Sequence, residues 1–438
     1  MRPSLLLIGL DRYALQACVR HDVDAVVVCG AAAYDDGLVD VPPALPVLMV
    51  DDQKNAESIL TALHRAGLGG RRFDGIHTTD EWAIVTASLL ARELGADYLT
   101  PAEAVGFRDK SLQKGLVAAA GIPTARVTVI PDVHDVSALT ALPYPAAVLK
   151  PAAGAATAKT SVVTGIEELR AVSAEYRRQG TPQRTFVLEE FLPGDEWLAD
   201  GVVFNGELVF CALGRYGAPC LTAVREDLAL TVDRLDPVDD QEAYEIGLPV
   251  VRRTLSALGL RNSTFHMELF HDPATGRVAF SECAARRAGA MVHEELQAKF
   301  NVNLGESGVL CALGRDPGLV VKRDPRHFGS TYLMAPPGVL IDCPSPLQVR
   351  ERPGVEFVRI ERPFGTVFDP ALSSTNQRIG QVMVSADSPE GLAARRAEVE
   401  AWFSERVVTA PAGATARELR AWQRRIRPDD DFGDTSWT

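Results

Sequence analysis

Short apolar runs alternate with amphipathic helical stretches over the first hundred residues. The expected strands are residues 5–9, 25–30, 47–50 and 75–78, and the helices that alternate with them end near residues 20, 66 and 94. This alternation predicts a parallel α/β layer over residues 1–105. The first turn, residues 9–12, lacks the Gly-x-Gly-x-x-Gly spacing that brings a backbone close to a pyrophosphate. This Rossmann-like layer is therefore expected to bind no nucleotide of its own.

The pattern changes to hairpins and longer helices between residues 106 and 315. The expected helices are residues 109–120, 166–178, 242–258 and 304–313, and the expected strands are 126–130, 146–150, 161–163, 185–189, 197–204 and 207–213. Asn205-Gly206 is a strong two-residue turn signal between the last two strands. We expect α+β architecture for this second domain.

Residues 316–438 form the third expected domain, a small α+β domain. Its expected elements are the short strands 329–334, 357–360 and 380–384 and the amphipathic helix 390–407. The chain then ends in an acidic stretch that has the composition of a flexible, frayed tail.

A second predicted hairpin in the middle domain carries two glutamates. Glu268 lies in one apolar run and Glu282 follows the other, with the turn residues 272–276 between the runs. Adjacent strands place both carboxylates side by side, and Arg286 follows within one turn. Mg²⁺ prefers oxygen ligands and often bridges nucleotide phosphates, and a guanidinium suits phosphate oxygens. A hairpin with solvated acids is the structural alternative.

Two further segments favour a nucleotide site. Lys150 ends a buried strand and precedes a loop of small residues, 151–160, where an ammonium and backbone amides can meet phosphate oxygens. A surface lysine is the alternative. Glu189 ends another apolar strand, where backbone groups would face a planar base edge, and Glu196 follows Leu192 by four residues, at a distance suited to ribose hydroxyls. An acidic edge hairpin is the alternative for this segment.

Composition narrows the classes of partner. Lys and Arg total 45 against 58 Asp and Glu, a formal net charge of −13, and no basic block precedes residues 417–427, so nucleic acid is not an expected partner. The seven cysteines are odd in number and include no Cys-x-x-Cys pair, which argues against a disulfide framework or a zinc site. Asp11 and Arg12 interrupt the first apolar stretch before a signal peptide or membrane span is complete. We expect a cytoplasmic protein with reduced thiols and no membrane association.

In their order along the chain, these segments resemble the ATP-grasp superfamily over residues 1–400. They are Asp109-Lys110, the strand end Lys150-Pro151, the stretch from Glu189 to Glu196, Glu268, and Glu282-x-x-x-Arg286. The resemblance implies a fold that clamps ATP between two α+β subdomains. It also implies that Lys110, Lys150 and the loop residue Thr157 contact ATP phosphates, Glu189 and Leu192 flank the adenine edge, Glu196 holds the ribose, Glu268 and Glu282 bind Mg²⁺ or a substituting Mn²⁺, and Arg286 steadies the transferred phosphoryl group.

Two departures from the family pattern bear on activity. Most members read Glu-x-Asn-x-Arg, whereas Ala284 stands in place of the Asn ligand, and the phosphate loop reads Ala-Ala-Thr at residues 155–157 rather than Gly-Ser-x-Gly. However, Glu-Cys-Ala-Ala-Arg-Arg-Ala-Gly at residues 282–289 is similar to the Glu-Ser-Ala-Ala-Arg-x-Ala-Gly stretch of bacterial L-amino acid ligases of the bacilysin-synthetase type, which are active without that Asn. Both carboxylates remain, so metal binding is expected to weaken rather than vanish, and the number of metal ions is left open.

The resemblance implies an enzyme, an ATP-dependent carboxylate–amine ligase. Such an enzyme phosphorylates a small carboxylate to an acyl phosphate, which an amine then attacks, and it releases ADP and phosphate. Candidate substrate residues near the metal region are His266, Arg287, Ala290 and His293. Each histidine has a structural role as its alternative.

Other activities of the same fold remain alternatives. They are a carboxylase, a kinase acting on a small metabolite, and a nucleotide-binding protein with little turnover. The sequence names neither the carboxylate nor the amine, and it leaves open whether the protein forms a homodimer.

Overall fold

A computed structural model describes residues 2–35, 39–155, 157–369 and 378–426, and the acidic tail predicted to fray lies outside these ranges. The chain divides into two compact units, one formed by residues 1–221 and 234–324 and the other by residues 222–233 and 325–438. The first unit contains the α/β layer together with the sheets that follow it, so the domain boundaries expected near residues 105 and 315 stay predictions. None of the described helices is long and apolar enough to cross a membrane.

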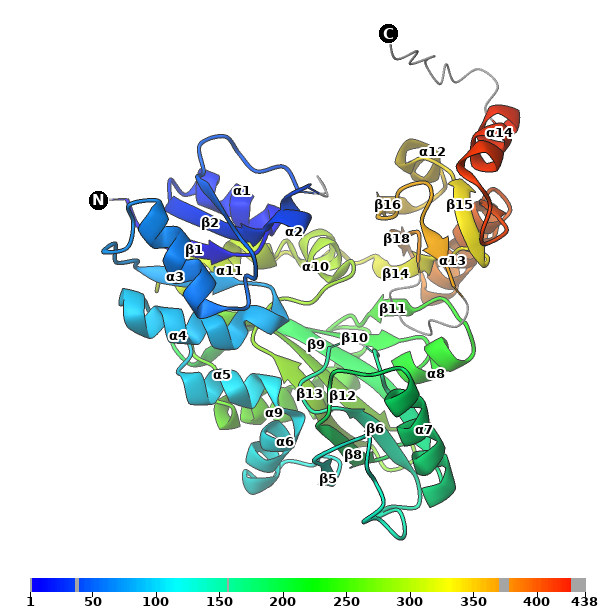
Figure 1. The fold of residues 1–438 in the computed structure, drawn as a ribbon, viewed down its shortest axis with the longest axis horizontal. Helices are drawn as coiled ribbons and strands as arrows, with labels where there is room; N and C mark the ends of the chain where they lie inside the picture. Colours follow the sequence, from blue (N-terminus) through cyan, green and yellow to red (C-terminus); the bar gives the residue numbers. More distant parts are fainter. Residues whose placement is uncertain (1, 36–38, 156, 370–377, 427–438) are drawn as a thin grey trace. The chain divides into compact units, whose positions relative to one another are not determined.

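The first unit begins with the predicted parallel layer (Figure 1). Its sheet has the order β3-β2-β1-β4 and consists of β1 (Ser4–Ile8), β2 (Asp24–Gly30), β3 (Val47–Val50) and β4 (Gly75–Thr78). The helical elements are α1 (Arg12–Arg20), α2 (Ala31–Asp35), α3 (Ala56–Arg65), the 3-10 turn η1 (Glu81–Ala83) and α4 (Ile84–Leu94). The fold class expected for this part of the chain is confirmed.

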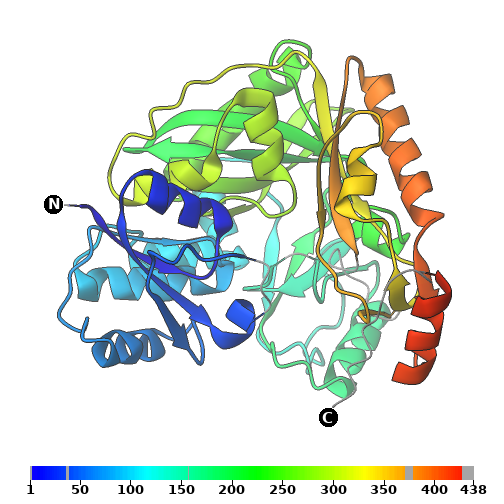
Figure 2. The same cartoon turned by 90° about the horizontal axis from the view of Figure 1, so that it is seen from above.

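Helices cover both faces of this sheet (Figure 2). They do so because the strands carry apolar side chains on both faces. Leu6 on one face packs in a cluster with Leu63 of α3, and Leu7 on the other face packs with Leu15 of α1 and Val309 of α11 (Leu304–Ala312). The carboxyl ends of β1 and β4 meet at one edge of the sheet, because the strands are parallel. The residues that follow these ends therefore lie close together.

A smaller antiparallel sheet follows two helices, α5 (Pro101–Arg108) and α6 (Lys110–Ala119). Its order is β5-β8-β6-β7, and it consists of β5 (Val127–Ile130), β6 (Ala147–Pro151), β7 (Ser161–Val163) and β8 (Phe186–Glu190). Helix α7 (Ile166–Arg178) shares a core with it through Leu169 and Tyr176. The sequence did not predict α5, which a capping box between Thr100 and Glu103 begins.

The other sheet of the first unit carries the glutamate hairpin. Its antiparallel strands lie in the order β13-β12-β9-β10 and are β9 (Asp195–Phe204), β10 (Glu207–Tyr216), β12 (Ser263–Asp272) and β13 (Arg277–Ala284). Two further helices of this unit are α9 (Gln241–Ala257) and α10 (Val292–Phe300), and α8 (Cys220–Arg225) begins in this unit and ends in the second. Asn205 and Gly206 both have positive φ, 52° and 81°, as the predicted hairpin turn requires.

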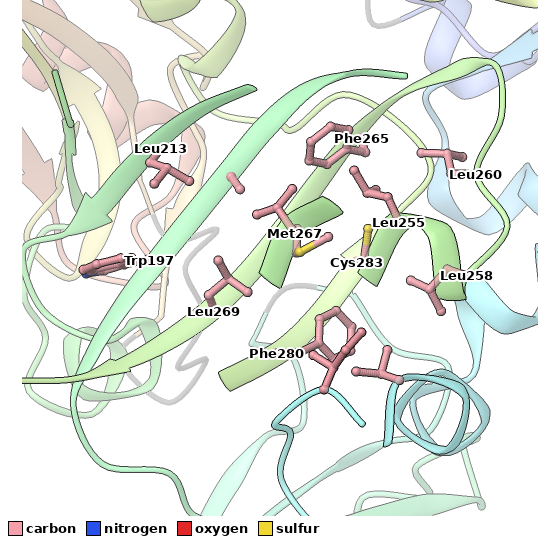
Figure 3. Close-up of a cluster of buried hydrophobic side chains, with 14 of the residues drawn as sticks. Trp197, Leu213, Leu255, Leu258, Leu260, Phe265, Met267, Leu269, Phe280 and Cys283 are labelled. Carbon is pink, nitrogen blue, oxygen red and sulfur yellow. The ribbon is translucent and has the colours of Figure 1, made fainter. Parts of the chain in front are cut away.

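One face of this sheet is the main apolar core of the unit. Phe265, Met267 and Leu269 come from alternate positions of β12 and cluster with Leu255 of α9 (Figure 3). Because strand side chains alternate between faces, His266 and Glu268 point away from this core. The opposite face of the sheet is therefore where polar chemistry is placed.

The second unit has its own core, formed by Leu340, Val382, Phe403 and their neighbours. Its larger group of strands is ordered β11-β14-β18-β16, with β11 (Thr231–Arg234), β14 (His327–Leu333), β16 (Val355–Ile360) and β18 (Gly380–Ala386). A small sheet has the order β17-β15-β19, with β15 (Gly338–Asp342), β17 (Val367–Phe368) and β19 (Val408–Ala410), and the helices are α12 (Pro346–Arg350), α13 (Pro389–Ser404) and α14 (Ala416–Ile426).

Candidate active site

The two glutamates of the hairpin lie directly opposite each other. Glu268 of β12 pairs in register with Glu282 of β13, and the register then shifts so that Leu269 pairs with Phe280. The extra residue, Ser281, forms a β-bulge. Phe280 and Cys283 both belong to the apolar core, so strict alternation from Phe280 would have turned Glu282 into that core. The bulge aims Glu282 at the same face as Glu268.

Helix α6 holds this bulge from the open edge of β13. The side-chain amide of Gln113 donates to the Cys283 carbonyl at 2.7 Å and accepts from the Cys283 amide at 3.0 Å. Lys114 Nζ donates to the Ser281 carbonyl at 2.6 Å. Gln113 and Lys114 thus take the place of a neighbouring strand. Lys110 lies on the same helix face, since residues three and four apart are neighbours.

Lysines and carboxylates converge at the end of β6. Lys150 Nζ lies 3.1 Å from Glu189 Oε2 and 3.4 Å from Glu282 Oε2. Lys110 Nζ lies 3.3 Å from the same oxygen of Glu282, and Lys114 Nζ lies 3.4 Å from Glu189 Oε2. The structure therefore brings together four predicted site residues from four separate segments, and it adds Lys114, which the sequence did not single out.

Electrostatics keep this cluster charged although it is buried. Burial alone would raise the pKa of Glu282, but Lys110 and Lys150 outweigh burial and hold the pKa well below its usual value. Burial disfavours the ammonium of Lys150, but Glu189 and Glu282 outweigh it and raise its pKa. Lys114 is the exception, because its burial dominates and lowers the pKa to about 8. Lys150 is thus a cation available to a phosphate, and Lys110 lies beside it at Glu282.

The three other predicted nucleotide residues lie in β9 and in two loops. Glu196 is the second residue of β9, and its Oε2 accepts a hydrogen bond of 2.7 Å from the Cys220 amide. Burial raises the pKa of Glu196 to about 8, and the charge of Glu268 adds to this effect. Leu192 is half-buried in the loop between β8 and β9, and Thr157 is half-buried in the small-residue loop after β6. Their contacts with adenine, ribose and phosphate stay predictions.

Arg286 is held by a carboxylate from the α/β layer. Its guanidinium pairs with Glu81, and Glu81 also pairs with Arg108 at 2.6 Å. The other terminal nitrogen of the Arg108 guanidinium donates to the Ala153 carbonyl, in the small-residue loop, at 2.7 Å. This connects Arg286 to the phosphate loop through Glu81 and Arg108. The sequence missed both residues, although Glu81 follows a strand end where parallel layers place functional groups.

The residues after Arg286 contact the first turn of the α/β layer. Arg287 pairs with Asp11 at 2.7 Å and lies 5.2 Å above the Tyr13 ring. His293, in the first turn of α10, stacks on the same ring with the centroids 3.6 Å apart. Ala290 lies between the two with a φ of 52°. The predicted substrate residues Arg287 and Ala290, in the loop after β13, and His293, at the start of α10, therefore belong to one segment packed against the layer.

His266 lies on the site face of β12 between two carboxylates. Its Nδ1 is 2.7 Å from Asp200 Oδ1, and its Nε2 is 3.7 Å from Glu268 Oε1. Burial disfavours the charged imidazole, but Asp200 outweighs burial and raises the pKa of His266 to about 10. His266 is therefore a charged neighbour of Glu268, and a direct contact with substrate stays a prediction.

The donor set fits Mg²⁺ that is shared with a nucleotide. Glu268 and Glu282 face one another, and their side chains are 21% and 28% exposed, so both carboxylates are open to a ligand. Within the described residues, no group of three or more His, Cys, Asp or Glu could hold a metal ion without other ligands. Mg²⁺ is commonly bound through one or two carboxylates with phosphate oxygens completing its shell. Metal binding here would accordingly depend on the nucleotide.

Comparison with known proteins agrees with this geometry. A family model described as the ATP-grasp domain matches residues 143–295, which include Lys150, Glu189, Glu268, Glu282 and Arg286. The L-arginine-specific L-amino acid ligase of Bacillus subtilis is 24% identical over 280 residues, which are 63% of this chain and 66% of that protein, slightly less than two thirds of its length.

Two solved structures share the fold. The L-amino acid ligase of Bacillus licheniformis has a TM-score of 0.75 at 18% identity, with 93% of this chain and 99% of that chain covered. The phosphoribosylglycinamide synthetase of Anaerococcus prevotii has a TM-score of 0.65 at 14% identity, with 94% and 100% covered. The resemblance stated from the sequence motifs is confirmed: residues 143–295 match the ATP-grasp domain, and the chain shares the fold of the solved L-amino acid ligase.

Proposed function

We propose that this protein is an ATP-dependent carboxylate–amine ligase that joins an amino acid, or another small carboxylate, to an amine. The observation that carries the proposal is the convergence of Lys110 and Lys150 on Glu282, which faces Glu268 across the hairpin. Cations and carboxylates in this arrangement suit a triphosphate and its metal ion. The similarity to L-amino acid ligases supports the choice of an amino acid as substrate.

The chain's own residues bind and orient the reactants. Phosphates would bind the ammoniums of Lys110 and Lys150, which pair with Glu189 and Glu282 in the structure. Glu268 and Glu282 would hold Mg²⁺, or Mn²⁺ in its place. When bound, such an ion neutralises charge on the phosphate oxygens. Positioning and charge neutralisation are the main contributions that a protein makes to phosphoryl transfer.

The proposed reaction has two transfers. A carboxylate oxygen of the first substrate attacks the γ-phosphorus of ATP, and ADP leaves. The amine nitrogen then attacks the acyl carbon, inorganic phosphate leaves, and the nitrogen loses a proton. Arg286, which is linked to the small-residue loop through Glu81 and Arg108, would stabilise the transferred phosphoryl group. The segment from Arg287 to His293 would line the substrate side.

The test is a screen of amino acids, singly and in pairs, for phosphate release that depends on ATP and Mg²⁺. Mass spectrometry should find an amide, and hydroxylamine should trap the acyl phosphate as a hydroxamate. Arginine belongs in the panel because the B. subtilis relative is named for it. ADP release with a phosphorylated product and no amide would show a kinase, and ATP binding without substrate-stimulated turnover would show a nucleotide-binding protein. Either result would contradict the proposal.

We also propose that the protein is cytoplasmic and that it forms a homodimer, which the sequence left open. Solution scattering of the purified protein would measure its mass. A mass of one chain would exclude the dimer.

A further inference from the structure

A chain of buried charged side chains leads from α10 to the metal carboxylate Glu268. Arg234 is completely buried and pairs with Glu295 of α10 at 2.5 Å and with Asp200 of β9 at 2.9 Å. Asp200, also completely buried, pairs with His266 at 2.7 Å. His266 in turn approaches Glu268. The proposed reaction uses none of Glu295, Arg234 or Asp200.

Stability does not account for such a chain. Removing two or more charges from water costs several kcal/mol per ion, and apolar residues of similar volume are often as good for stability. The neighbouring positions on the other face of β12 are apolar, so the same strand could have been packed without charges. Buried charge networks of this kind are commonly found where a side chain has to be held in one orientation.

The geometry shows what is held. His266 and Glu268 are two residues apart on one strand face, so their side chains are neighbours. Asp200 lies directly opposite His266 in the β9–β12 register, and it fixes one ring nitrogen. The other ring nitrogen is thereby directed toward Glu268, at 3.7 Å from its carboxylate. Glu282 pairs with two lysines, whereas Glu268 is approached by His266.

We propose that Asp200 and His266 are positioning residues that orient the Glu268 carboxylate for a metal ion, with Arg234 and Glu295 fixing Asp200 in place. This inference rests on the proposed function, because it takes Glu268 as a metal ligand. It assigns His266 to the metal carboxylate and not to the substrate. Partners that orient a metal ligand typically contribute roughly 10- to 100-fold to metal affinity when removed.

The experiment measures Mn²⁺ affinity by electron paramagnetic resonance, with a non-hydrolysable ATP analogue present. His266→Ala is expected to weaken Mn²⁺ binding by roughly 10- to 100-fold. His266→Gln, which keeps an amide donor, should recover part of this loss. Asp200→Asn should also weaken Mn²⁺ binding, because the His266 ring loses the carboxylate that orients it. Thermal melting of each variant checks that it folds.

His271→Ala is the matched control. His271 lies on the same strand but stacks on Trp197 at 4.3 Å, on the core face of the sheet. Its replacement removes a histidine from β12 without touching Glu268, so Mn²⁺ affinity should stay at the wild-type value.

Three results would overturn the proposal. Unchanged Mn²⁺ affinity in folded His266→Ala would overturn the positioning role and leave the proposed function standing. A raised KM for the carboxylate substrate with Mn²⁺ affinity intact would make His266 a substrate residue. Wild-type protein that binds no Mn²⁺ with the nucleotide would overturn the proposed function as well, which separates the two failures.

Discussion

Replacing Lys150 with methionine tests the nucleotide site most directly. Lys150→Met keeps the aliphatic stem and removes the ammonium that lies between Glu189 and Glu282. Each carboxylate keeps one other partner, since Lys114 lies 3.4 Å from Glu189 and Lys110 lies 3.3 Å from Glu282. The loss of folding stability should therefore stay below the about 3–5 kcal/mol of a buried pair that is fully broken.

The expected effect on ATP is larger than a surface lysine would give. One charge-assisted hydrogen bond contributes about 1.5–3 kcal/mol, which corresponds to roughly a 10- to 150-fold weaker ATP affinity. Lys110→Met should fall in the same range, because Lys110 approaches the same oxygen of Glu282. Titration calorimetry with a non-hydrolysable ATP analogue and saturating Mg²⁺ measures the affinity.

Lys114→Met is the contrast within the same cluster. Lys114 is 2% exposed, and its ammonium is engaged by the Ser281 carbonyl at 2.6 Å. Its replacement should lower the free energy of unfolding by about 1–3 kcal/mol, because the bulge carbonyl loses its donor. Its effect on ATP affinity should be smaller than that of Lys150→Met. Equal losses of ATP affinity in the two variants, or none in Lys150→Met and Lys110→Met, would refute the reasoning.

Three further predictions concern the metal, the substrate and pH. Glu268→Gln and Glu282→Gln should each remove most turnover while the protein still folds, and near-normal ATP consumption in both would contradict the metal assignment. Ala290→Trp should suppress a large substrate by about 1–3 kcal/mol through steric exclusion and spare a small one, which specificity constants for both would show. Burial lowers the pKa of His77 to about 4 from 6.5 in the unfolded chain, so wild-type stability should fall by about 3 kcal/mol as pH drops through that window. His77→Asn should lose that slope in denaturation measured at each pH, and a slope equal to wild type would assign the pH dependence to other groups.

Much of the fold could be predicted from the sequence because its elements are local and strongly patterned. The apolar strands of the α/β layer, the Asn205-Gly206 turn and the Glu268–Glu282 hairpin depend on neighbours along the chain. The helices α5 and α10 were missed. Helix α10 is buried on nearly all sides, so no polar and apolar faces alternate along its sequence.

For the candidate site, the sequence predicted the residue types but not their partners in space. The residue types and their order determined by themselves that the chain resembles an ATP-grasp protein, since lysines, glutamates and an arginine in that order suit a metal-bound triphosphate. The partners of these residues could not be predicted. Glu81 meets Arg286 across a separation of 205 residues, and Gln113 meets Cys283 across 170.

The direction in which the Glu282 side chain points was decided only by the tertiary structure. Strict alternation along β13 would turn Glu282 toward the core that holds Phe280, and only the bulge at Ser281 returns it to the side of Glu268. A bulge leaves no local sequence signal here, because Gln113 and Lys114 of a distant helix satisfy its backbone groups. The sequence thus determined which groups the site contains, and the packing of α6 against β13 determined which way one of them points, because hydrogen bonds across the fold outweigh the strand's own period.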